Sequence, residues 1–245
     1  MIDDISHRPW LKPNRSWIIK MVWEDLLFAH WPVNAEEITP HLPSGLTLDT
    51  FDGTAFLGIV PFRMCGTRLR GIPPVPGPSS FLELNVRTYV HHENKPGVWF
   101  FSLDASSRLA VRTARRFFHL PYFDAEMHMG KCADEFAYIS RRTHRGSSAA
   151  GLDMRYRPKG NVFFSEPKSF EHWLTERYCL YSSDKKERLY CGEIHHGRWP
   201  LQKADAEFQI NDMVKWLNIR LPHTQPHLLF AKRQEVVAWT LKQIT

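Results

Sequence analysis

From Leu82 to Val90, apolar and polar side chains alternate with the single exception of Thr88, which constrains this part of the chain to a β-strand. Successive side chains of a strand point to opposite faces of its sheet. One face is therefore aliphatic, and the other carries an acid, an amide, a guanidinium and a phenol: Glu83, Asn85, Arg87 and Tyr89. If the polar face looks into a cavity, it is a binding site for a small polar ligand. If it faces water, Glu83 and Arg87 pair along a solvated sheet.

The rest of the chain has enough apolar residues to cover such a sheet. Hydrophobic residues make up 43% of the 245 residues, so the chain can bury a substantial core. Seventeen prolines indicate many short connections and argue against an all-helical fold. A chain of this length fits one large domain or two small ones.

Turn residues divide much of the chain into strands. The Asp-Gly dipeptide at residues 52–53 predicts a hairpin between Thr47–Thr50 and Ala55–Met64. Phe81–Val90 and Val98–Leu103 are expected to form a second hairpin. Further strand patterns occupy Ala125–Met129, Glu135–Arg142, Leu228–Ala231 and Glu235–Leu241.

Four short segments have helical patterns, and polar residues stand where their N-termini need caps. Asn34 begins the first, with Glu37 placed to complete a capping box. Ser106 or Ser107 caps the second, whose start Asp104 is expected to cap or to stabilise through the helix dipole. The four segments cover about residues 35–42, 107–118, 169–177 and 212–217.

Strands dominate, and the helices are interspersed without a regular βαβ rhythm. This predicts an α+β fold with a predominantly antiparallel, barrel-like sheet and a few flanking helices. Residues 71–78 are too rich in proline to continue a sheet, and we interpret them as a connection across one end of it. Residues 1–16 are expected to form a loose N-terminal arm, and residues 17–245 a single domain.

The net charge of +6 would suit nucleic acid, an anionic membrane surface or acidic ligands. The basic residues are dispersed, however, and the densest groups, within residues 112–116 and 141–145, are short. Nucleic acid is therefore an unfavoured partner.

The cysteines and the N-terminus bear on the compartment. Four cysteines without zinc-ligand spacing are typical of reduced thiols in a reducing compartment. Residues 1–12 lack the apolar core of a signal peptide, and no apolar run reaches the roughly 18 residues that span a membrane. We expect a soluble cytoplasmic protein with no membrane partner.

The chain contains no familiar catalytic or cofactor-binding motif. It has no G-x-S-x-G elbow, phosphate-binding loop, dinucleotide fingerprint or H-E-x-x-H pair. The adjacent pairs His91-His92 and His195-His196 would point to opposite sides of a strand, so neither pair chelates a metal as a unit. We interpret both pairs as turn or surface residues, and we predict no metal and no cofactor.

Nearly the whole chain resembles the YqjF-like family of uncharacterised conserved bacterial proteins. The stretches that carry the resemblance are Trp23–Val33, Leu42–Phe62, Phe81–Val90, Gly97–Ala105, Leu120–Ala125, Ser169–Tyr181, Trp199–Leu201 and Val236–Trp239. That family in turn resembles the acetoacetate decarboxylase-like fold. The resemblance implies a curved, cone-like antiparallel β-barrel that holds a small keto acid in its interior.

The chain departs from that fold at its catalytic lysine. The decarboxylase uses a Schiff-base lysine in a Pro-Lys-Lys motif after a helix, assisted by a glutamate on a preceding strand. The resemblance places Glu83 at the glutamate, but Pro121-Tyr122-Phe123 stands at the lysine motif, and no lysine lies between Lys95 and Lys131. A phenol cannot form an iminium with a ketone as a lysine amine does, so Schiff-base decarboxylation is not expected.

The favoured function is the binding of a small anionic or carbonyl-containing molecule in a barrel cavity. Arg87 would pair with a carboxylate, and Tyr122 would donate a hydrogen bond to a carbonyl or enolate oxygen. Glu83, in a partly apolar interior, would act as an acid or a base. The remaining candidates are Asn85 and Tyr89, which would orient the ligand, and Arg63, at the barrel mouth or on the outer surface.

Two other functions fit the sequence. A lyase, hydratase or isomerase without a Schiff base would act on a small keto acid through the same residues. A nucleic-acid-associated basic protein would bind with a steep salt dependence. By analogy with enzymes of the resembled fold, a homo-oligomer is a candidate assembly.

Overall fold

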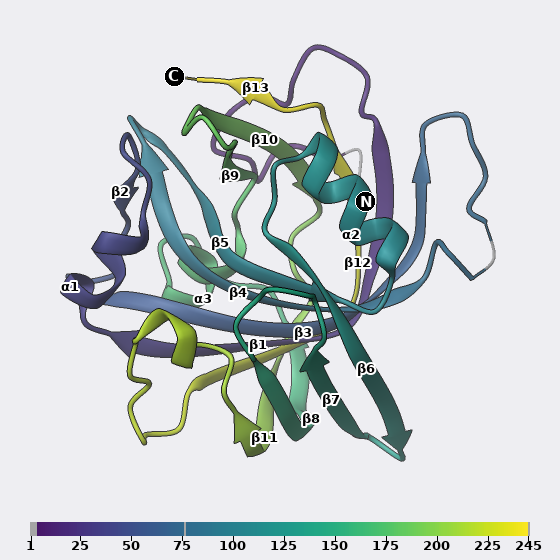
Figure 1. Ribbon diagram of the computed structural model, residues 1–245, viewed down its shortest axis with the longest axis vertical. Coiled ribbons are helices and arrows are strands. Elements are labelled where there is room, and N and C mark those ends of the chain that lie inside the picture. The colour runs from purple at the N-terminus through teal and green to yellow at the C-terminus, as the bar shows by residue number, and fades with distance from the viewer. Residues whose placement is uncertain (1–3, 76, 245) are drawn as a thin grey trace.

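A curved sheet of thirteen strands organises the chain (Figure 1). The computed structural model describes residues 4–75 and 77–244. The strands are β1 (Ile19–Val33), β2 (Thr47–Leu48), β3 (Ala55–Leu69), β4 (Phe81–His92), β5 (Lys95–Ala105), β6 (Tyr122–Cys132), β7 (Glu135–Arg142), β8 (Gly151–Phe163), β9 (Cys179–Ser183), β10 (Leu189–His196), β11 (Leu201–Asn211), β12 (His227–Ala238) and β13 (Lys242–Gln243). The helices are α1 (Ala35–Ile38), α2 (Arg108–Phe117) and α3 (Phe170–Thr175), with 3₁₀ turns η1 (Thr39–His41) and η2 (Lys215–Leu217).

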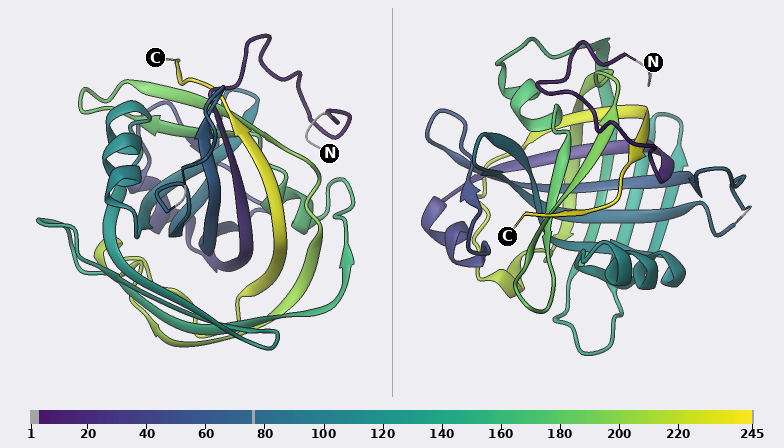
Figure 2. Two further views of the ribbon diagram at one scale, coloured as in Figure 1. Left: turned by 90° about the vertical axis from the view of Figure 1, so that its right-hand side faces the viewer. Right: turned by 90° about the horizontal axis from the view of Figure 1, so that it is seen from above.

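The sheet closes on itself in two hydrogen-bonded circuits. Its strand order is β13-β10-β9-β5-β6-β7-β8-β11-β12-β1-β3-β4-β2, and β5 also pairs with β4 while β10 pairs with β12. One circuit therefore passes through β5, β6, β7, β8, β11, β12, β1, β3 and β4. The other passes through β5, β9, β10, β12, β1, β3 and β4. Figure 2 shows how strongly the sheet curls.

Neighbouring strands are antiparallel, except where β5 runs parallel to β6 and to β9. The α+β class with a mostly antiparallel sheet and few helices is therefore confirmed. The main apolar core lies inside the first circuit, where Leu27 of β1, Ile59 of β3 and Leu84 of β4 pack against Tyr138 and Tyr156. The second circuit encloses the opposite face of β1, β3 and β4.

The predicted Asp-Gly turn forms, but its predicted hairpin is wrong. Phe51 and Thr54 close the turn, and Asp52 and Gly53 adopt the positive φ angles of 46° and 77° that such a turn needs. However, β2 pairs with β4. Because β3 already pairs with β1 along one edge and with β4 along the other, it has no free edge for β2.

The helix N-caps predicted at Asn34, Ser107 and Ser169 form in the structure. Asn34 accepts a hydrogen bond from the Glu36 amide at 3.0 Å, and Ser107 accepts one from the Ala110 amide at 3.3 Å. Asp104 is the exception. It lies inside β5 and does not cap α2, because its carboxylate is held on the far side of the sheet by Arg142.

Several strands follow no clear local pattern. The predicted strands Leu228–Ala231 and Glu235–Leu241 are one strand, β12, and the last predicted helix is reduced to the turn η2. The sequence does not predict the strands β1, β8, β10 and β11. Within the described residues, no helix is both long enough and apolar enough to cross a membrane.

Part of the expected N-terminal arm packs against the sheet. Residues 4–18 contain no helix or strand, but Arg8 is buried against β10, where it donates to the Ile194 carbonyl at 2.7 Å and pairs with Glu193 at 2.9 Å. His195 and His196 are also buried, at 1% exposure each. The surface assignment of that pair is therefore wrong, because aromatic rings pack against both imidazole side chains.

Candidate functional site

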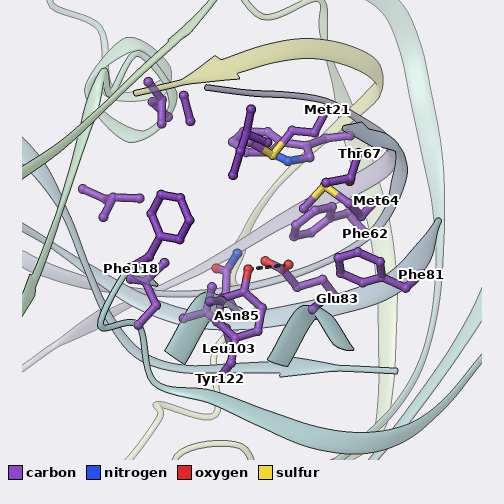
Figure 3. Close-up of a pocket in the computed structure, with 18 of the residues that line it drawn as sticks. Met21, Phe62, Met64, Thr67, Phe81, Glu83, Asn85, Leu103, Phe118 and Tyr122 are labelled. Carbon is purple, nitrogen blue, oxygen red and sulfur yellow. Dashed lines mark hydrogen bonds between the residues drawn. The ribbon is translucent and has the colours of Figure 1, made fainter. Parts of the chain in front are cut away.

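A cavity of about 500 Å³ lies within the second circuit (Figure 3). This volume is within the range of small-molecule sites. The cavity is bounded by β1, β3, β4, β5, β9 and β10, by the tip of β12, by α2 and by residues at the end of α3. Most of the lining is apolar and includes Met21, Phe62, Met64, Phe81, Leu103 and Phe118.

The polar face of β4 looks into this cavity. Glu83, Asn85 and Arg87 line it, whereas Leu84 and Val86 point into the main core on the other side of the sheet. The alternation of the sequence is preserved because β4 is paired on both edges, with β3 and with β5. A small ligand in the cavity would therefore meet an acid, an amide and a guanidinium from one strand.

Glu83 and Tyr122 form a buried hydrogen-bonded pair. The Tyr122 hydroxyl donates to Glu83 Oε2 at 2.7 Å, and the two residues are only 8% and 3% exposed. Tyr122 comes from β6, and the parallel pairing of β6 with β5 places it beside Leu103, another lining residue.

The apolar surroundings of this pair change its protonation. Burial raises the pKa of Glu83 from 4.5 to about 8, although the hydrogen bond from Tyr122 acts in the opposite direction. Burial also raises the pKa of Tyr122 well above its ordinary value. At neutral pH, both groups are therefore mainly uncharged and can donate as well as accept hydrogen bonds.

Asn85 adds a third polar group beside this pair. It is 5% exposed, and its Oδ1 atom is buried without a hydrogen-bond partner. Figure 3 shows the Asn85 amide next to the Glu83–Tyr122 hydrogen bond. Buried polar atoms are usually paired, so an unpaired amide oxygen at a cavity wall is available to a ligand.

Arg87 brings a positive charge without a matching acid. Its guanidinium lies over the Phe28 and Tyr89 rings and donates to the Tyr89 hydroxyl at 3.2 Å. No carboxylate lies within ion-pairing distance of it in the described part of the chain. The pairing of Glu83 with Arg87, the alternative expected for a solvated sheet, does not form. Arg87 is therefore suited to bind an anion.

A second guanidinium at the cavity wall was not predicted. Arg177 is 6% exposed, pairs with Asp49 at 2.6 Å and donates to the Trp173 carbonyl at 2.6 Å. Its charge is thus already matched within the protein. No local sequence pattern marks this residue, because its acidic partner lies 128 residues away in the chain.

Two predicted ligand-binding residues lie outside the cavity lining. Tyr89 is fully buried behind it, where its hydroxyl holds Arg87 and lies 2.6 Å from His30 Nε2. Arg63 is on the other face of β3 and contacts Met129, whereas its neighbours Phe62 and Met64 line the cavity. The structure therefore brings Glu83, Asn85, Arg87 and Tyr122 together and leaves Arg63 apart.

Gly58 provides the space in which Arg87 and His30 pack. A Cβ atom there would lie 2.7 Å from His30 Nε2 and 3.3 Å from Arg87 Cγ. His30 is fully buried and cannot move away, so Gly58→Ala is expected to destabilise the protein by about 1–3 kcal/mol. Urea unfolding would measure this. Gly130→Ala is the control because its Cβ would meet nothing within 4 Å, and equal stabilities of the two variants would contradict the prediction.

The side chains that line the cavity determine which chemical groups could bind a cofactor or form a covalent bond with a ligand. In the described residues, none of the lining side chains is a lysine. The same residues contain no cluster of three His, Cys, Asp or Glu side chains arranged to hold a metal ion. The polar chemistry available in the cavity is therefore that of carboxyl, phenol, amide, hydroxyl, thiol, imidazole and guanidinium groups.

Solved structures of other proteins have a similar fold. The structure of MppR, an enduracididine biosynthesis enzyme complexed with pyruvate, matches with a TM-score of 0.66 at 11% identity, over 96% of this chain and 93% of that one. An acetoacetate decarboxylase from Legionella pneumophila matches with a TM-score of 0.65 at 11% identity, over 100% and 95% of the two chains. At these identities the likeness shows a shared fold.

Comparison of sequences shows the family. The chain is 44% identical over 231 residues to the uncharacterized protein YqjF of Bacillus subtilis (strain 168), covering 94% of each chain. Residues 20–235 match the family DUF2071, described as an uncharacterized conserved protein. The expected likeness to YqjF and to the acetoacetate decarboxylase-like fold is thus confirmed, and the chain belongs to the DUF2071 family.

Proposed function

We propose that this protein binds a small anionic or carbonyl-containing molecule in the cavity, without a Schiff-base lysine. The observation that carries the proposal is the unmatched Arg87 guanidinium on the wall of a mostly apolar cavity. A buried or half-buried charge is costly unless it is paired, and an anionic ligand would pair it. The second circuit would form the cone-like barrel around the ligand.

The two polar parts of the wall suit the two ends of a keto acid. Arg87 stands two positions after Asn85 on β4, or about 7 Å further along the strand. A carboxylate would pair with Arg87, while a carbonyl oxygen would accept from Tyr122 or from the protonated Glu83 carboxyl. The pyruvate complex of MppR supports this ligand class, because that protein shares the fold.

An enzyme on the same site is the second candidate. A carboxyl with a pKa of about 8 in contact with a phenol is a proton donor or acceptor that works near neutral pH. Protonation of a ligand carbonyl by Glu83 would favour enolisation, hydration or elimination. Because no lysine lines the cavity in the described residues, a lyase, hydratase or isomerase of this kind would act without an iminium.

Replacing Arg87 with methionine tests the proposal. We expect Arg87→Met to weaken the binding of a small keto acid at least about 30-fold, because losing one partner of a buried charge pair costs about 2–5 kcal/mol. Wild type is first screened by thermal shift with 2-keto acids, dicarboxylates and aldehydes, where a ligand at 100 times its Kd adds about 2.7 kcal/mol. Isothermal titration then gives Kd for both forms.

Arg68→Met is the control for this experiment. Arg68 also lines the cavity, but it stands next to the exposed Leu69 and its guanidinium stacks on Trp17. Its loss should change Kd less than about threefold, as expected for a half-buried charge at a solvent-facing rim worth 1 kcal/mol or less. The proposal would be contradicted if wild type and Arg87→Met bound the ligand with equal affinity, or if none of the compounds in the screen bound to wild type.

A further inference from the structure

Four of the polar groups of the cavity lie on or beside β4, and this bears on the size of its ligand. Figure 3 shows Glu83, Asn85 and Tyr122 close together. Arg87, which also lines the cavity, follows two positions after Asn85 on β4. The rest of the wall is formed largely by bulky apolar side chains from β1, β3, β5 and α2. A three-carbon keto acid at the polar groups would leave most of this apolar wall uncovered in a cavity of about 500 Å³.

The mouth of the cavity is also apolar. Four large apolar residues both line the cavity and face solvent: Leu69, Ile72 and Val75, at the end of β3 and in the connection to β4, and Leu109 of α2. They are 54%, 49%, 56% and 65% exposed. Exposed apolar residues gathered at one opening indicate a binding role, because soluble proteins keep such patches small.

We propose that the ligand is amphiphilic: a medium-chain aliphatic carboxylic or keto acid whose head reaches Arg87 and whose tail runs along the apolar wall to the mouth. The inference rests on the proposed function and specifies its ligand class. It accounts for both features together, because the charged head is matched by the Arg87 guanidinium, and the tail covers the wall and the exposed rim.

A chain-length series gives the expected signature. Each methylene that moves from water into the cavity should tighten binding about fourfold, which corresponds to about 0.8 kcal/mol per buried methylene. Straight-chain saturated carboxylates from butyrate to dodecanoate are titrated below their micelle concentrations. Trp23 and Trp199 line the cavity, so tryptophan fluorescence reports the binding. Kd should fall at each step until the tail emerges at the mouth and should then level off.

Two pairs of variants locate the head and the tail. Leu109→Gln should weaken the longest acids several-fold and leave butyrate unchanged. Its control is Phe117→Gln, on the same helix and equally exposed at 65%, because Phe117 does not line the cavity. For every acid, Arg87→Met should weaken binding more than Arg68→Met does. A larger effect of Arg68→Met would place the head at the mouth and overturn the proposal.

The experiment separates this inference from the proposed function. If butyrate and small keto acids bind and longer chains bind more weakly, the tail is excluded and the inference is overturned, while the proposed function stands. If no acid of any length changes the fluorescence or the melting temperature, the proposed function itself is overturned. Straight-chain alcohols of equal length should share the slope but bind more weakly, and equal affinity of alcohols and acids would overturn the role of the carboxylate.

Discussion

Asp104→Ala is expected to lower the free energy of unfolding by about 3–5 kcal/mol, the usual result of removing one partner of a buried ion pair. The Asp104 and Arg142 side chains are 0% and 1% exposed. Arg142 donates three hydrogen bonds of 2.8–3.1 Å to Asp104 and lies over the Phe123 ring at 4.2 Å. Without Asp104, this guanidinium would be buried without a counter-charge. A chain of this length should then melt roughly 6–20 °C lower.

A neighbouring ion pair on β6 and β7 is the control. Glu126 pairs with Arg141, one residue before Arg142, but these side chains are 61% and 73% exposed. Glu126→Ala should therefore cost no more than about 1 kcal/mol in urea unfolding. The double variant Asp104→Leu, Arg142→Met should recover much of the loss, because apolar residues of similar size often replace buried ion pairs. Equal losses for Asp104→Ala and Glu126→Ala would contradict the prediction.

Features that depend on neighbours in the sequence were predicted well. The hairpin of β4 and β5 and the cap at Ser107 follow from turn and capping residues that act within a few positions. Pairings between distant segments were not. The partner of β2 is decided by which edges other strands leave free, and Asp104 was assigned to the next helix because Arg142 lies 38 residues further on.

The candidate site divides in the same way. The alternation along β4 was enough to put Glu83, Asn85 and Arg87 on one face, and the structure supplies the cavity that this face meets. The place of Tyr122 beside Glu83 depends on the parallel pairing of β5 and β6, which no local pattern reveals. The two placements of Arg63 stayed open because its strand is apolar on both faces, so the sequence does not show which face meets the cavity.

The stability of wild type relative to Glu83→Gln is expected to fall as the pH rises from about 4.5 to about 8. The pKa of Glu83 is about 8 in the folded state, raised by burial from its ordinary 4.5. Below pH 4.5 the carboxyl is protonated in both states. Between the two pKa values only the unfolded state releases the proton, so unfolding becomes easier by about 1.4 kcal/mol per pH unit. Above pH 8 the difference levels off, on the order of 3–5 kcal/mol below its acid value.

Urea unfolding of both forms from pH 4 to pH 9 measures this difference. Glutamine keeps the shape of the protonated carboxyl and can still accept from Tyr122, so the two proteins should be similar at pH 4 and diverge above it. Glu126→Gln should not reproduce the fall, because the exposed pair with Arg141 lowers the pKa of Glu126. Parallel curves for wild type and Glu83→Gln would mean that Glu83 ionises normally. The enzyme candidate would then lose its neutral proton donor, whereas anion binding by Arg87 would be unaffected.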